Sequence, residues 1–113
     1  MKRIILILLS IVTIASCTAP NSRWEGNMGG EYMIIDFDPK GYVDVYTRDL
    51  DWAGGGLCQR KGDVIEFAGV SVRIKSGYGY DYYKLQSATI DKRRMRVESE
   101  CDGYTYYDTF IKM

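Results

Sequence analysis

Apolar and polar residues alternate along most of the chain beyond residue 30, which is the pattern of β-strands with one buried face. The alternation is strictest over 70–75 and 94–101. Tyrosine, valine, isoleucine, threonine and phenylalanine are frequent there, and long helical periodicity is absent. The sequence therefore predicts an all-β domain.

Turn signals divide this region into eight short strands. The predicted strands cover 31–37, 42–48, 57–60, 64–68, 70–75, 80–90, 94–101 and 104–112. Asp102-Gly103 gives the strongest hairpin signal, because both residues tolerate positive φ. Residues 49–56, which contain Trp52 and three consecutive glycines, are predicted to form a mobile loop.

Tight turns between consecutive strands make neighbouring strands antiparallel. An antiparallel meander of eight strands in so short a chain closes most economically into a small up-and-down barrel, which has no free edges. The alternative is a two-sheet β-sandwich. A barrel of this size is either filled by its own side chains or holds one small ligand. The sequence does not decide between these, nor does it set the oligomeric state.

A basic start, Lys2-Arg3, precedes an apolar run over 4–15, as in a secretory signal. The run is too short to span a bilayer comfortably, since a spanning helix needs about 20 residues. The following Ile14-Ala15-Ser16-Cys17 resembles the lipobox of bacterial lipoproteins. This resemblance implies cleavage before Cys17 and attachment of a diacylglycerol to its thiol. The alternatives are an ordinary signal cut after Ala19 and an uncleaved anchor helix.

The lipobox resemblance divides the chain into a signal peptide over 1–16, a lipidated cysteine and tether over 17–29, and a β-barrel domain over 30–113. Within the tether region, Trp24 is expected to mark the start of the folded part, because an exposed tryptophan would leave its large apolar area unused. The predicted location is the cell envelope, with the lipid anchored in a bacterial outer membrane on its periplasmic or its surface side.

A second resemblance concerns the start of the domain. Trp24-Glu25-Gly26 and the later Phe37-Asp38-Pro39-Lys40-Gly41 resemble the opening of small lipocalin-like lipoproteins. Tryptophan precedes glycine here, whereas the usual order in that family is Gly-x-Trp. The resemblance implies a lipocalin-like barrel with Trp24 near its closure.

Two cysteines remain once Cys17 is assigned to the lipid. In an oxidising compartment, two thiols usually pair, so a disulfide between Cys58 and Cys101 is predicted. The alternative is two buried free thiols, because sequence spacing does not show whether the two Cβ atoms approach each other.

Charge and composition exclude several functions. The chain has 15 basic and 15 acidic residues, and the signal removes two basic ones, so nothing suggests nucleic-acid binding. Histidine is absent, which removes histidine-dependent catalytic sites and histidine metal ligands. The acidic pairs Asp36/Asp38 and Asp49/Asp51 lie in or beside predicted turns, where aspartate commonly forms local hydrogen bonds. No catalytic residue, metal or cofactor is therefore predicted, and we expect no enzyme.

The ten tyrosines are the unusual feature of the composition. Tyr78, Tyr80 and Tyr82, together with Trp52, are the candidate binding residues, because rigid amphipathic rings suit protein and sugar contacts. Tyrosine is also a good strand residue whose hydroxyl reaches solvent at a barrel rim. The predicted function is a non-catalytic binding module for a small molecule, glycan or protein. The alternative is a hydrolase inhibitor, since Ser76-Gly77-Tyr78 resembles the Ser-Gly loop of membrane-bound lysozyme inhibitors.

Overall fold

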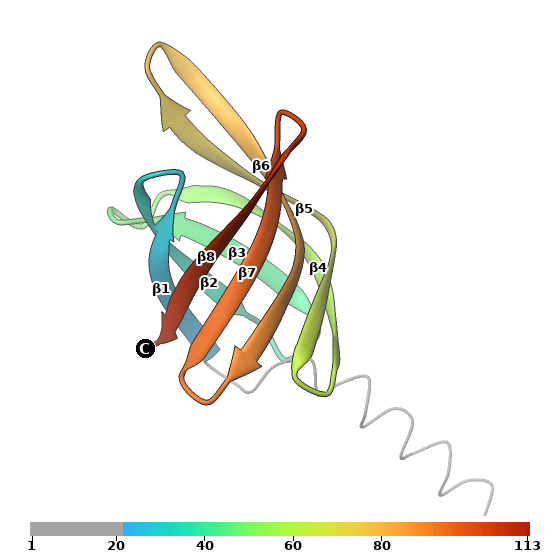
Figure 1. Cartoon of the computed structure of the whole chain (residues 1–113). Coiled ribbons are helices and arrows are strands. Elements are labelled where there is room, and N and C mark those ends of the chain that lie inside the picture. The colour runs from blue at the N-terminus through green and yellow to red at the C-terminus, as the bar shows by residue number, and fades with distance from the viewer. Residues whose placement is uncertain (1–21) are drawn as a thin grey trace, which may run out of the picture.

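The computed structural model describes residues 22–113, which form one closed barrel of eight antiparallel strands (Figure 1). The strands are β1 (Ser22–Met28), β2 (Glu31–Phe37), β3 (Tyr42–Thr47), β4 (Trp52–Lys61), β5 (Val64–Ser76), β6 (Gly79–Asp91), β7 (Arg94–Cys101) and β8 (Tyr104–Lys112). Each strand pairs with its neighbours in sequence, and β1 also pairs with β8. The predicted lipocalin-like barrel is confirmed, and the two-sheet sandwich is not the architecture. The predicted signal peptide over 1–16 and the predicted lipidation site, Cys17, lie outside the described residues.

The barrel has two different ends. We call the end that carries the β1–β2, β3–β4, β5–β6 and β7–β8 connections the mouth. The opposite end, the base, carries the other three connections, the start of β1 and the end of β8 (Figure 1). The described part of the chain contains no helix that is long and apolar enough to cross a membrane.

Strand β1 closes the barrel and was not among the predicted strands. It pairs with β2 along its whole length and with β8 through Trp24, Glu25 and Gly26. The Trp24 side chain is buried, and its indole N–H donates to Ser22 Oγ at 2.9 Å. The domain boundary expected at residue 30 thus lies inside the fold, because residues 22–28 supply the strand that removes the last free edge.

The three glycines of β4 lie in a strand, so the predicted mobile loop over 49–56 is wrong from Trp52 onward, and only 49–51 belong to the connection between β3 and β4. A Cβ added to Gly54 would lie 1.9 Å from the carbonyl oxygen of Ser71. Added Cβ atoms at Gly55 and Gly56 would similarly meet backbone oxygens of the two adjacent strands at 2.6 and 2.7 Å. The glycines are therefore required because β3 and β5 approach β4 closely.

Strand β5 joins two segments that were predicted as separate strands, 64–68 and 70–75. Its pairing with β6 shifts between Glu66 and Ser71, and Gly69 in that interval has a φ of +66°. The glycine thus makes an irregularity within one strand, where the sequence suggested a reversal. The total of eight strands was nevertheless correct, because this merger offsets the addition of β1.

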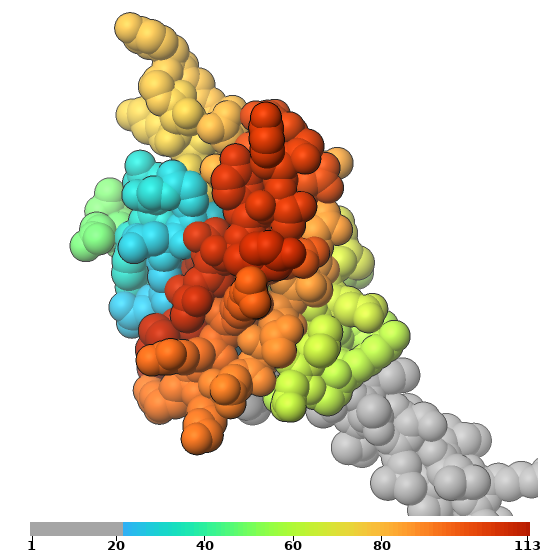
Figure 2. All heavy atoms as spheres, in the orientation of Figure 1, coloured from blue at the N-terminus to red at the C-terminus, as the bar shows by residue number. Residues whose placement is uncertain are grey.

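Strands β5 and β6 extend beyond the rest of the barrel as a hairpin (Figure 1). β4 pairs with β5 only as far as Val72, and β7 pairs with β6 only from Lys84. Residues 73–83 therefore have no neighbouring strand other than each other in the described structure. Figure 2 shows this hairpin, in yellow, projecting past the mouth.

The barrel interior is filled by apolar side chains. The largest fully buried ones are Phe37, Phe110, Met28, Met33, Ile35, Ile65, Ile74, Met95, Val43, Val45, Val72 and Val97. They belong to one contiguous cluster that takes members from every strand. Full burial of such a side chain contributes about 1.5–3 kcal/mol relative to exposure. Of the two possibilities for an eight-stranded barrel, this one is packed.

The predicted disulfide between Cys58 and Cys101 is wrong, because Cys101 is a free, buried cysteine. Cys58 lies in the part of β4 near the base, opposite Phe67 of β5. Cys101 is the last residue of β7, next to the β7–β8 turn at the mouth. The meander places these two positions toward opposite ends of the barrel, which the spacing along the chain does not reveal.

Candidate binding site at the mouth

A cleft of 590 Å³ lies at the mouth, between the β1–β2 turn, the β3–β4 connection and the projecting hairpin. Its lining residues are Asn27, Gly30, Glu31, Tyr32, Met33, Thr47, Arg48, Asp49, Asp51, Trp52, Ala53, Arg73, Lys75 and Tyr80. Its volume falls within the range of about 300–1,000 Å³ that is typical of small-molecule sites. The cleft is therefore large enough to be a binding site.

Aromatic rings at the cleft are held in place by polar partners. The Trp52 indole N–H donates to Asp44 Oδ1 at 3.0 Å. The Tyr32 hydroxyl donates to Glu25 Oε1 at 3.1 Å. Burial raises the pKa of the Tyr32 hydroxyl, and the contact with Glu25 raises it further. These contacts orient the rings before any ligand arrives.

Two arginines stack on tyrosine rings at the cleft. The Arg48 guanidinium lies 4.7 Å from the centre of the Tyr32 ring, and that of Arg73 lies 4.7 Å from the centre of the Tyr80 ring. Such cation–π contacts contribute about 0.5–1 kcal/mol at exposed sites. Each contact occupies one face of a tyrosine ring and restricts its motion.

Charges of both signs line the cleft in equal number. The basic residues are Arg48, Arg73 and Lys75, and the acidic residues are Glu31, Asp49 and Asp51. The two ion pairs found among residues 22–113, Arg23–Asp36 and Lys61–Glu66, lie elsewhere. The cleft thus presents donors and acceptors without a net charge.

The structure brings together two of the four predicted binding residues. Trp52 and Tyr80 both line the cleft and are 58% and 53% exposed. Tyr78 lies fully exposed in the turn at the hairpin tip, and Tyr82 is exposed on β6 without lining the cleft. The predicted tyrosine face is therefore divided between the cleft and the tip of the hairpin.

The cleft also contains residues that were not among the predicted binding residues, namely Tyr32, Arg48, Arg73 and Lys75. Each occupies a strand or turn position that reads as ordinary alternation in its own segment. The up-and-down order puts these connections at the same end, and closure of the barrel brings them around one opening. A usable signal was the common position of Tyr32, Arg48 and Lys75 within a few residues of mouth turns, which an up-and-down order implies.

Tyr83 closes the barrel interior beneath the mouth. Its ring contacts the ring of Tyr106 at 5.5 Å between centres. A Cβ added to Gly29 of the β1–β2 turn would lie 2.9 Å from the Tyr83 hydroxyl oxygen. Tyr83 therefore reaches from β6 to the opposite turn, and a ligand at the mouth contacts the cleft, not the packed interior.

Two polar atoms near this region of the interior have no hydrogen-bond partner among the described residues, Ser99 Oγ and Asp108 Oδ2. Burial raises the pKa of the Asp108 carboxyl. Burial also raises the pKa of the Tyr83 hydroxyl, with smaller contributions from Cys101, Tyr106 and nearby carboxylates. The mouth end of the interior is therefore more polar than the base end, and some of its polar atoms lack hydrogen-bond partners.

The residues that come closest to a metal site are Asp81, Cys101 and Asp102, whose ligand atoms lie within 4.8 Å of one another. A metal would require the thiolate form of cysteine. Burial, followed by the neighbouring Asp102 carboxylate, raises the pKa of the Cys101 thiol. The thiol also contacts Asp102 Oδ2 at 3.8 Å. This arrangement favours a protonated, structural cysteine.

The predicted carboxylate pairs have different surroundings. Asp36 forms an ion pair with Arg23 at 3.3 Å, and Asp38 Oδ1 accepts from the backbone N–H of Lys40 at 2.7 Å. Asp49 and Asp51 line the cleft. Asp38 thus makes the local contact expected in a turn, Asp36 joins β2 to β1, and Asp49 and Asp51 contribute acceptors to the mouth.

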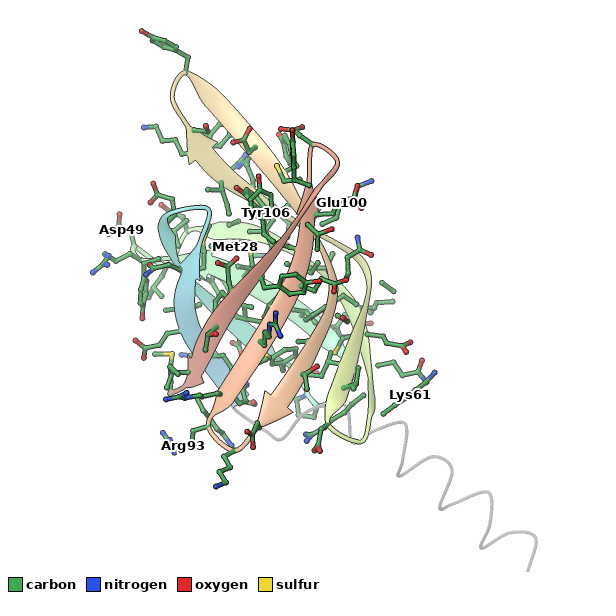
Figure 3. All side chains as sticks on the ribbon, viewed as in Figure 1. Met28, Asp49, Lys61, Arg93, Glu100 and Tyr106 are labelled. Carbon is green, nitrogen blue, oxygen red and sulfur yellow. The ribbon has the colours of Figure 1, made fainter. Side chains whose placement is uncertain are left out.

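Figure 3 shows Asp49 and Glu100 toward the mouth and Lys61 and Arg93 at the base.

Comparison with family models, with curated proteins and with solved structures gives no match for this chain.

Proposed function

We propose that this protein is a lipid-anchored binding module of the bacterial cell envelope, without catalysis, which binds its partner at the mouth. The observation that carries the proposal is the exposure of oriented aromatic rings around a 590 Å³ cleft, above an interior that is packed. Exposed aromatic residues are enriched at binding surfaces, because they supply rigid contact area. A packed interior argues for binding at the mouth and against transport inside the barrel.

The position of the proposed anchor supports this arrangement. β1 starts at Ser22 at the base, so residues 17–21 alone would connect the lipid to the barrel. Five extended residues reach at most about 18 Å. A lipid on Cys17 would therefore hold the base near the membrane and leave the mouth directed away from it.

The charge of the base is consistent with that orientation. The three connections at the base, over 38–41, 61–63 and 91–94, carry five basic and three acidic residues. Basic side chains are attracted to anionic lipid headgroups by about 1 kcal/mol each close to the surface. The base is thus the end better suited to face a membrane.

The anchor is tested with Cys17→Ala, expressed as the full chain and followed by membrane fractionation. We expect the variant to leave the membrane fraction or to persist as uncleaved precursor. Normal processing with full membrane retention would contradict the lipid anchor.

The binding role of the mouth is tested by crosslinking the acylated protein in intact envelope. The crosslinked partners of the wild type are compared with those of Trp52→Ala and of Tyr107→Ala. Tyr107 is 54% exposed on β8, outside the cleft, and controls for loss of an exposed aromatic ring. Partners that persist in Tyr107→Ala and disappear in Trp52→Ala support the proposal, and equal partner sets in all three proteins contradict it.

A second candidate is inhibition of a lysozyme-type hydrolase by insertion of the β5–β6 hairpin. The observation that favours it is the projection of residues 73–83 beyond the barrel, with Ser76-Gly77-Tyr78 at the tip. The matching experiment measures lysozyme activity with wild-type protein and with Tyr78→Ala. Inhibition that depends on Tyr78 would support this role, and unchanged hydrolysis at saturating protein would exclude it for the enzymes tested.

A further inference from the structure

We infer that the mouth cleft binds a short, uncharged oligosaccharide, with sugar rings packed on the exposed faces of Trp52 and Tyr80. This inference rests on the proposed function, because it names the ligand class of the same cleft. It follows from three properties of the cleft: oriented aromatic faces, balanced polar groups and a packed barrel interior below it.

The aromatic faces provide the contact area. Trp52 comes from the start of β4 and Tyr80 from the start of β6, so two separate strands contribute the rings. The face of an aromatic ring is electron-rich and attracts the weakly positive C–H groups on the flat side of a sugar. Because Arg73 stacks on the Tyr80 ring, one ring face is stabilised by the arginine while the ring as a whole stays half exposed.

The polar groups provide the hydrogen bonds that a carbohydrate needs. Each sugar hydroxyl both donates and accepts, as a serine hydroxyl does. The cleft offers carboxylate acceptors from Asp49 and Asp51, and cationic donors from Arg48 and Lys75. Since acidic and basic residues balance, the cleft has no net charge that would select an anionic or cationic ligand.

The shape of the cleft disfavours the other ligand classes. A small apolar molecule would require an apolar enclosure, but Tyr83 and the packed core fill the barrel below the mouth. A peptide that binds through its side chains would need apolar pockets to hold them. The only aliphatic residues of the cleft, Met33 and Ala53, are buried in the core, so no apolar pocket for a side chain is available there.

The inference is tested by NMR on ¹⁵N-labelled full chain carrying Cys17→Ala, titrated with chitotriose, cellotriose and maltotriose, and with trialanine as a peptide probe. The two tryptophans give separate indole N–H signals. We expect at least one trisaccharide to shift the Trp52 signal at millimolar concentration. The Trp24 signal is the internal reference, because this indole is buried in the core and should not move.

The control variant is unusually well matched. Tyr80 and Tyr107 are almost equally exposed, and each ring is covered by an arginine, Arg73 at 4.7 Å and Arg96 at 4.4 Å. Only Tyr80 lines the cleft. We expect Tyr80→Ala to weaken the trisaccharide by about tenfold, the upper value for one aromatic contact, and Tyr107→Ala to change it by less than about twofold.

Each outcome decides the matter. A trisaccharide that shifts Trp52 and is weakened by Tyr80→Ala alone supports the inference. Absence of any Trp52 shift with all three sugars overturns it, as does equal weakening by Tyr80→Ala and Tyr107→Ala. If trialanine alone shifts Trp52, the oligosaccharide inference fails, but the proposed binding function at the mouth remains. The proposed function itself fails if the protein crosslinks to the same partners in envelope whether or not Trp52 is replaced by alanine.

Discussion

The two tryptophans of this protein occupy opposite ends of the same barrel. Trp24, near the base, is 2% exposed and packs in the core, whereas Trp52, at the mouth, is 58% exposed. Both indole N–H groups donate to a side-chain oxygen at similar distance, Ser22 Oγ and Asp44 Oδ1. The same residue type therefore serves stability at one end and is available for contact at the other.

The difference extends to the surroundings of each tryptophan. Around Trp24 the barrel is closed by the β1–β8 pairing, and apolar side chains fill its interior. Toward the mouth, the β1–β8 pairing stops at Gly26 and Phe110, and Ser99 Oγ and Asp108 Oδ2 are buried without hydrogen-bond partners. The mouth therefore combines buried side chains such as Tyr83 with exposed rings and buried polar atoms that lack partners, which the surroundings of Trp24 do not show.

The largest contrast is expected from truncating the two tryptophans. Trp24→Ala should cost about 3–5 kcal/mol in the free energy of unfolding, because it leaves a large cavity in the core. Trp52→Ala should cost within about 0.5 kcal/mol, as for other surface substitutions. Urea denaturation followed by circular dichroism measures both. Equal losses would show that the mouth is as much a part of the core as the base.

A smaller loss is expected when the close approach of the strands is blocked. Gly54→Ala should destabilise the barrel by about 1–3 kcal/mol, because the new Cβ would overlap the Ser71 carbonyl oxygen unless β4 and β5 separate. Gly79→Ala is the control, since an added Cβ there meets nothing within 4 Å. Thermal melts of the two variants should therefore differ, and identical melting temperatures would refute the role of Gly54.

Replacing Asp108 should raise the free energy of unfolding, whereas the preceding substitutions lower it. Its pKa is raised in the folded state by burial, so its contribution to stability is complete below the unfolded value of 3.8 and is lost as pH rises through the folded value. Asp108→Asn should therefore stabilise the protein at neutral pH, by about 1 kcal/mol for a partly buried, unsatisfied group. Melting temperatures across a pH series test this, and the advantage of the variant should disappear at low pH. A variant that is less stable than wild type at pH 7 would disprove the assignment.

The smallest effect is expected at the tip of the hairpin. Tyr78 is fully exposed, so Tyr78→Ala should change the free energy of unfolding by less than about 0.5 kcal/mol. Tyr83→Ala is the comparison, because Tyr83 is buried and should cost about 3–5 kcal/mol. Chemical denaturation of both variants measures the difference, and a large loss for Tyr78→Ala would place the hairpin tip in the core.

Local pattern in the sequence was enough for much of the fold. Alternation together with turn signals located β2, β7 and β8 to within a residue, and Asp102 and Gly103 both have the positive φ, 53° and 82°, that their hairpin turn requires. In β6, exposed Tyr80 and Tyr82 lie on one face and buried Tyr83 on the other, as alternation along a strand requires. These features depend on contacts between residues close in the chain, or on one face of one strand, which a sequence displays directly.

Contacts between distant strands decided the rest. β1 is a strand because β8 returns to pair with it, and Gly54 lies in a strand because its neighbours approach too closely for a Cβ. The course of the meander separated Cys58 from Cys101, and barrel closure placed Tyr32, Trp52 and Tyr80 around one cleft. The sequence by itself determined an all-β meander with many aromatic residues. The tertiary structure alone decided which of these residues meet, because register and closure depend on pairings between segments far apart in the chain.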